Sequence, residues 1–313
     1  MSTSSGWRFT LLSTLSNLSS FQLDPLLLVP VLAIGIAYGV GYRRFTQRRH
    51  AGGGRFRTRA GLFVVGYTAL VLALISPLHA VGEEYFSVHM VQHLLLSLVA
   101  APLLLLSNSM PVLLWAFSPR DRATIGRVVG QAGPTRSLLR WLTKPAIAWT
   151  LFLLAQWLWH LPAAYDLALQ NRWVHYLEHI SFFATAVMFW WPVIGAAPLP
   201  SPLGYPARLA YTFLAWLPGS FLGAGIMLSR APLYPHYVAA AEMNGTDALV
   251  DQQLAGLIMW IPGDVLFAAI LILLFVAFMN NEERKEVRID RELDARDLAA
   301  AEGSVQLRNQ RVG

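Results

Sequence analysis

Seven long apolar segments leave this chain few ways to fold. They cover residues 25–42, 60–78, 87–106, 146–161, 174–196, 207–228 and 254–279. Each is about long enough to cross a hydrocarbon core of ~30 Å as a helix. Because lipid offers a backbone no hydrogen-bond partners, spanning segments of this kind are helical. The sequence therefore predicts an all-α fold, a polytopic membrane protein with a bundle of seven transmembrane helices.

The composition supports a membrane protein and excludes several other classes. Of the 313 residues, 55% are hydrophobic and 13% are charged, whereas soluble domains carry about 25% charged residues. Cysteine is absent, which excludes disulfides, iron–sulfur clusters and thiolate metal sites. No P-loop, Rossmann, HExxH or GxSxG motif is present, and we expect a protein that is not an enzyme. The predicted divisions are a polar N-terminal tail (1–23), a transmembrane domain (24–280) and a charged cytoplasmic tail (281–313).

The basic residues predict the orientation in the membrane. All of the 24 Lys and Arg residues except Arg8, Arg172 and Arg230 fall on one side of the predicted spans. Connections rich in Lys and Arg stay in the cytoplasm, so the N-terminus is expected outside and the C-terminus inside. This asymmetry also accounts for the net charge of +6 without a nucleic-acid partner. The expected partner of the long apolar surfaces is the lipid bilayer.

Two histidine pairs are the strongest candidates for a functional site. His89 and His93 open the third span, and His175 and His179 open the fifth. Residues four apart share one helix face, with Cβ atoms about 5–6 Å apart, and histidine is the commonest metal ligand among side chains. Both pairs lie near the outer ends of their spans, so the sequence predicts that they surround one metal site. The alternative is that each pair lines a helix end through hydrogen bonds.

Further candidates lie close to these pairs in the predicted topology. They are His160 and Met90 as additional ligands, and Glu178, Asp251 and Asp264 as carboxylates that orient a ligand histidine. A thioether beside imidazole suits a soft ion such as Cu(I). A carboxylate within a span is costly unless it is paired or binds an ion. For Asp264 the alternative is that it caps a half-helix after a break at Pro262–Gly263, a role that Asp fills well.

Several segments together indicate a family. They are HMVQHLLL (89–96), WHLPAAYDLAL (159–169), HYLEHISFF (175–183), FWWPVIG (189–195) and DQQLAGLIMWIPG (251–263). Over roughly residues 60–280 the chain resembles the seven-span CtaG-type cytochrome c oxidase assembly factors of bacteria. The resemblance implies a multi-pass protein of the bacterial inner membrane that binds copper and delivers it to the catalytic subunit of a heme–copper oxidase. It also implies oxidase subunits as partners. It places His89, His93, His175 and His179 at the metal site, with His160 nearby.

The residues by themselves leave other functions open. A single-haem b-type cytochrome would clamp its haem between one histidine from each pair. A membrane metalloenzyme, such as a di-iron hydroxylase, would need several motifs rich in histidine and carboxylate. In this sequence Glu178 alone is a carboxylate close to a histidine pair. The last alternative to a copper-handling assembly factor is a scaffold that binds no metal.

Overall fold

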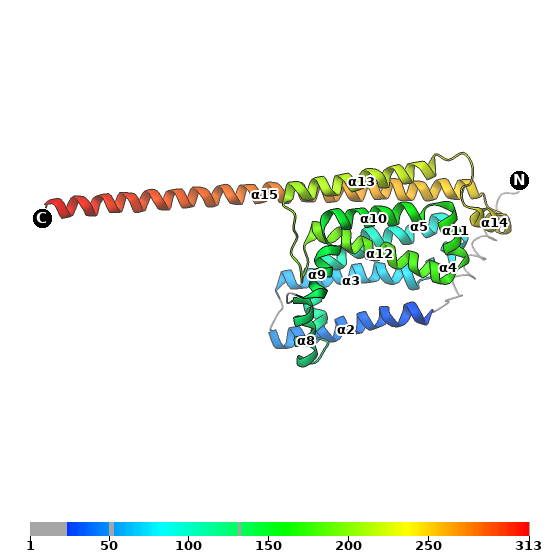
Figure 1. Ribbon diagram of the computed structural model, residues 1–313, viewed down its shortest axis with the longest axis horizontal. Coiled ribbons are helices and arrows are strands. Elements are labelled where there is room, and N and C mark those ends of the chain that lie inside the picture. The colour runs from blue at the N-terminus through cyan, green and yellow to red at the C-terminus, as the bar shows by residue number, and fades with distance from the viewer. Residues whose placement is uncertain (1–23, 50–52, 131–132, 313) are drawn as a thin grey trace, which may run out of the picture.

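The computed structural model describes residues 24–49, 53–130 and 133–312, and the predicted polar tail (1–23) lies outside them. Its elements are α-helices apart from one π-helical segment, η1 (Figure 1). In chain order they are α2 (Pro25–Arg49), α3 (Gly54–Ile75), α4 (Leu78–Glu84), α5 (Phe86–Leu94), η1 (Leu95–Ala100), α6 (Ala101–Leu106), α7 (Met110–Leu114), α8 (Pro119–Gly130), α9 (Pro134–Leu142), α10 (Pro145–Trp159), α11 (Pro162–Gln170), α12 (Arg172–Ile194), α13 (Tyr205–Met227), α14 (Pro235–Asn244) and α15 (Ala248–Val312).

The all-α membrane fold is confirmed. Within the described ranges, six helices are long and apolar enough to cross a membrane, with α5, η1 and α6 together forming the span Phe86–Leu106. A seventh span is obtained if α9 and α10, which meet at an angle of 63°, are taken as one broken helix. The predicted fourth span (146–161) corresponds to α10, which has 15 residues and reaches spanning length only together with α9. The predicted orientation across the membrane is not tested by the helices and stays a prediction.

The two spans that carry the histidine pairs form the centre of the bundle. In the most apolar 18-residue stretch of each span, buried residues make up 61% in Phe86–Leu106 and 50% in α12. The corresponding share is only 28% in α3 and 28% in α13. The indole Nε1 of Trp190 on α12 donates to the carbonyl of Ser97 in η1 at 2.9 Å. Polar side chains on these central helices therefore face protein, which avoids the cost of exposing them to acyl chains.

Short helices cover the end of the bundle where the histidines lie. In Figure 1, α4, α11 and α14 gather at one end, while α8 and α9 lie at the opposite end. The connection 229–253 between the sixth and seventh predicted spans contains α14 and the start of α15. Tyr165 and Tyr234 pack against Phe86 with ring centroids 5.1 and 4.4 Å away. These aromatic contacts fix the short helices over the central spans.

The break at Pro262–Gly263, on which the capping alternative for Asp264 depends, does not occur, since α15 runs without interruption from Ala248 to Val312. Proline is tolerated inside a membrane helix when neighbouring groups satisfy the released backbone. Helix α13 lies alongside α15 (Figure 1). A Cβ atom on Gly256 of α15 would lie 2.7 Å from the carbonyl oxygen of Gly223 on α13, so this close approach requires glycine. Beyond the bundle α15 continues alone as a long helix (Figure 1).

Candidate metal centre

The two histidine pairs meet in the interior of the bundle, as the sequence predicts. The Nε2 atoms of His89 and His93 lie 3.0 Å apart, and Nε2 of His179 lies 3.5 Å from that of His89. The His175 ring stacks on His89 with centroids 5.3 Å apart. All four residues are at most 5% exposed. Helices α5 and α12 therefore bring four imidazoles to one place.

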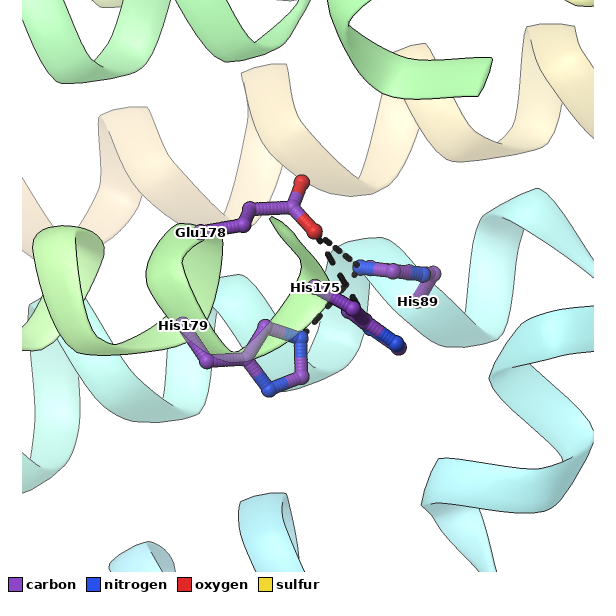
Figure 2. Close-up of side chains that lie close together, drawn as sticks. All are labelled: His89, His175, Glu178 and His179. Carbon is purple, nitrogen blue, oxygen red and sulfur yellow. Dashed lines mark hydrogen bonds and ion pairs between the residues drawn. The ribbon is translucent and has the colours of Figure 1, made fainter. Parts of the chain in front are cut away.

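Glu178 supplies a carboxylate at the centre of these imidazoles. Its Oε2 lies 3.8 Å from Nε2 of His89 and 3.9 Å from Nε2 of His175, and its Oε1 lies 3.6 Å from Nε2 of His93. The side chain is fully buried, and neither oxygen has a hydrogen-bond partner among the described residues. Figure 2 shows Glu178 turned toward His89 and His175, with His179 beside them. A buried carboxylate without hydrogen bonds is costly unless a cation sits against it.

Ligand-atom distances in this group fit a metal ion. One atom each from His89, His175, Glu178 and His179 lies within 4.8 Å of the others. In a tetrahedral site with bonds near ~2.0–2.1 Å, ligand atoms are about 3.3–3.4 Å apart. The observed separations of 3.5 Å between His179 and His89 and 3.8 Å between His89 and Glu178 are slightly wider. Small side-chain movements would close the four residues on one ion. A haem clamped between the pairs would need one imidazole on each of its two faces. The rings of the two pairs instead lie directly against each other, with centroids 5.3–5.5 Å apart.

Tyr237 on α14 orients one of the imidazoles. Burial raises the pKa of Tyr237 well above its usual value, so the phenol keeps its proton. Its hydroxyl donates to the carbonyl of Gly82 at 2.8 Å, and its oxygen lies 3.3 Å from Nδ1 of His89. The tyrosine can therefore accept a hydrogen bond from Nδ1–H of His89. This fixes the tautomer in which Nε2 has a lone pair directed at the other ligands.

A second group of possible ligands lies between the buried centre and the surface. His79 and Glu83 on α4 join His175, with one ligand atom from each within 4.8 Å of the others. The rings of His79 and His175 stack at 5.0 Å. Burial lowers the pKa of His79, while the carboxylates of Glu83 and Asp24 act in the opposite direction. These residues line an open cavity of about 460 Å³, which we call the vestibule.

His160 and Met90 contact each other and lie outside the four-residue group. Nε2 of His160 is 3.4 Å from Sδ of Met90, and the His160 ring lies 5.9 Å from that of His93. Both side chains are buried, with exposed fractions of 5% and 0%. The structure thus divides the predicted ligands into a central set and a neighbouring pair.

The hypothesis that Asp251 orients a ligand histidine is not supported by its contacts. From α15, its carboxylate accepts hydrogen bonds from the backbone N–H of Phe86 at 2.6 Å and of Ser87 at 3.3 Å. It also accepts from the Ser87 hydroxyl at 2.5 Å. These groups form the first turn of α5, where a negative charge stabilises the helix dipole. Asp251 therefore holds the helix that bears His89 and His93, and its hydrogen bonds within the described residues go to the start of that helix and not to an imidazole.

Asp264 bonds to a neighbouring helix in the structure. Its carboxylate accepts from the indole N–H of Trp216 and from the Ser220 hydroxyl, each at 2.5 Å. These partners lie on α13, so Asp264 faces the bundle as predicted. The capping alternative needs correction, because α15 is continuous there. Within the described residues, the hydrogen bonds of Asp264 go to Trp216 and Ser220 and to no histidine.

Sequence reasoning assigned Glu178 a supporting role and did not place Tyr237 or Glu83 at the site. Glu178 lies three residues after His175, so the helical period already puts both on one face. Tyr237 and Glu83 come from short helices far away along the chain, and no spacing rule connects them with His89 or His175. His79 is predicted from the sequence to lie on an open rim of the site, together with His160 and His236.

These features define a multi-pass helical membrane protein with a buried histidine–glutamate group that could hold a metal ion. The chain belongs to the cytochrome c oxidase caa3 assembly factor family (Caa3_CtaG), whose family model matches residues 36–281.

Two relatives illustrate the similarity to other bacterial proteins. An uncharacterized protein of Mycobacterium leprae (ML1998) is 26% identical, over 88% of this chain and 42% of its own length. An uncharacterized protein of Mycobacterium bovis (Mb0105) is also 26% identical, over 85% of this chain and 40% of its own. The chain thus spans about two fifths of the length of these relatives. No solved structure matches it.

Proposed function

We propose that this protein binds copper between helices α5 and α12 and supplies it to a cytochrome c oxidase during assembly. The ligands are His89, His175, His179 and Glu178, with His93 in contact with them. In this proposal the protein is a metal carrier and not an enzyme. Copper is its cargo, and the catalytic subunit of the oxidase receives it.

The observation that carries the proposal is the state of Glu178. Both of its oxygens are buried without a hydrogen-bond partner in the described part of the chain, yet they face Nε2 atoms of His89, His93 and His175 at 3.6–3.9 Å. A purely structural cluster would place donors against those oxygens, because an unpaired buried polar group costs about 1–3 kcal/mol and a charged one more. A cation bound by the carboxylate and the imidazoles removes this cost.

The chemistry of the ligands and the family together favour copper. Imidazole suits copper, zinc, iron and nickel alike, so the ligands alone do not select one metal. Oxidase assembly supplies the reason for copper, because the family takes its description from an oxidase and heme–copper oxidases require this metal.

The vestibule gives the buried centre a path to the surface. His175 lines the vestibule and also belongs to the central group. Glu83 and His79 also line the vestibule, so an entering ion would meet them before it reached His175. Arg172, which is 58% exposed, pairs with Asp24 at 2.7 Å on the wall of the same cavity. An ion can therefore exchange ligands stepwise, from the vestibule to the buried set, without crossing lipid.

The test compares His179→Gln with His236→Gln in a strain that lacks its own copy of the protein. His236 is a matched control, because it lies at the same end of the bundle but bonds to the carbonyl of Glu83 and not to the central group. Bound copper is measured on untagged protein by elemental analysis. Copper content and activity are measured on the oxidase purified from each strain.

We expect His179→Gln to lose bound copper and to yield an oxidase poor in copper, while His236→Gln matches wild type. Membrane levels of each variant serve as the control for folding. The proposal is wrong if wild-type protein binds no copper, or if the His179→Gln strain makes an oxidase with its full copper content.

A further inference from the structure

A small cavity lies on the other side of His93, away from the vestibule. Its volume is about 40 Å³, which exceeds the ~10–15 Å³ needed for one water-sized particle. Helices α5, α10, α13 and α15 and the segment η1 form its walls. Its polar lining includes His93, His160, Asp264 and the sulfur-bearing side chains Met90 and Met259.

The contact between His160 and Met90 is not a hydrogen bond, because neither of the two facing atoms carries a hydrogen. Nδ1 of His160 lies 2.6 Å from the carbonyl oxygen of Gln156. A carbonyl only accepts, so Nδ1 carries the proton, and in a neutral imidazole Nε2 then has only a lone pair. That Nε2 lies 3.4 Å from Sδ of Met90, which is also a lone-pair donor without hydrogen. Two buried electron-pair donors thus face each other.

We propose that His160 and Met90 form a second metal site, selective for monovalent copper, in this cavity. The inference rests on the proposed function, because it assigns the protein a further position for the same cargo. Thioether sulfur with imidazole is a soft ligand pair that favours Cu(I) over the harder divalent ions. The four-residue centre, with a carboxylate and imidazoles alone, lacks this preference.

The distance between the two donor atoms fits a shared ion. With a metal–nitrogen bond near ~2.0 Å and a metal–sulfur bond near ~2.3 Å, a separation of 3.4 Å corresponds to an angle of about 104° at the metal. This angle is close to the tetrahedral value. The pair therefore needs little rearrangement to hold an ion, and the cavity offers a volume beside it for a further ligand.

His93 separates the second site from the central group. Its Nε2 lies 3.0 Å from Nε2 of His89 and 3.6 Å from Oε1 of Glu178. Its Nδ1 is buried without a hydrogen-bond partner among the described residues, and its side chain lines the cavity. The ring thus belongs to the walls of both sites. An ion leaving the central group would meet His93 before it reached His160.

X-ray absorption at the copper edge tests the second site. Untagged full-length protein is loaded without oxygen, using the Cu(I)–acetonitrile complex as the probe. The variants are Met90→Leu and, as a matched control, Met243→Leu, whose parent side chain is 82% exposed on α14. We expect a sulfur neighbour at ~2.3 Å in wild type and in Met243→Leu. Met90→Leu should lose it and bind about one Cu(I) fewer per chain.

The outcomes separate this site from the central group. A wild-type spectrum with only nitrogen and oxygen neighbours overturns the proposal, even if Met90→Leu folds poorly. A sulfur neighbour that persists in Met90→Leu also overturns it. If the sulfur signal depends on Met90 while His179→Gln retains all its copper, the second site stands and the proposed central site fails. If His179→Gln loses copper but the wild-type spectrum shows no sulfur neighbour, the central site stands and the second site fails.

Discussion

Glu178→Gln should make the protein more stable than wild type without metal and less stable than wild type with copper bound. Both carboxylate oxygens of Glu178 are buried with no hydrogen-bond partner among the described residues, which without a bound cation costs about 1–3 kcal/mol. A glutamine of the same shape can donate N–H to the Nε2 lone pairs of His89 and His175, which lie 3.8 and 3.9 Å from Oε2. At about 2 °C per kcal/mol for a chain of this size, the melting temperature should rise by about 2–6 °C.

Copper should reverse this order of stability. A ligand present at 100 times its dissociation constant stabilises a folded protein by about 2.7 kcal/mol, which corresponds to a rise of about 5 °C in wild type. Glu178→Gln loses the anionic ligand and should show a much smaller rise. Intrinsic tryptophan fluorescence on heating, at one fixed scan rate in the same detergent, measures both values. The reasoning fails if the metal-free variant melts below wild type, or if copper raises both melting temperatures equally.

Three further predictions concern the residues that support the site and the orientation of the chain. Tyr237→Phe removes the group that fixes the His89 tautomer, and copper affinity measured by chelator competition should fall about 10–100-fold; unchanged affinity would remove Tyr237 from the site. Asp251→Asn weakens the hydrogen bonds to the first turn of α5 and should cost about 0.5–2 kcal/mol, seen as a lower melting temperature with copper stoichiometry unchanged. A reporter fused after Gly313 should be active only in its cytoplasmic form, and activity of a periplasmic reporter there would contradict the predicted orientation.

The apolar spans and the histidine pairs could be predicted because they depend on local spacing. A run of apolar residues of sufficient length has one stable form in lipid, and two histidines four residues apart share a helix face. The meeting of α5 with α12 followed from one further rule, that polar faces in a bilayer turn toward each other. These steps required no knowledge of distant contacts.

The partners of the aspartates could not be predicted in the same way. The sequence indicates how deep Asp264 lies in its span, but not which neighbouring helix its side chain faces. The structure gives it Trp216 and Ser220 on α13. Asp251 likewise bonds to α5, 164 residues away at Ser87. Such partners depend on how the helices pack, which spacing along one helix does not determine.

The short helices over the site were missed for a related reason. Helices α4, α11 and α14 have only 7–10 residues, too few for a clear period in the sequence. They nevertheless contribute Tyr237 and the vestibule residues His79 and Glu83. The sequence therefore indicated the buried histidine pairs, while the short helices over them and the residues that line the vestibule emerged only from the packing.

The most direct test of the central claim is a crystal of untagged protein grown with copper, measured at the copper absorption edge. The anomalous signal locates the metal independently of the protein phases. We predict a peak about 2.0–2.2 Å from Nε2 of His89, Nε2 of His179 and an oxygen of Glu178. A peak elsewhere, or ordered side chains of these residues with no peak among them, would contradict the account.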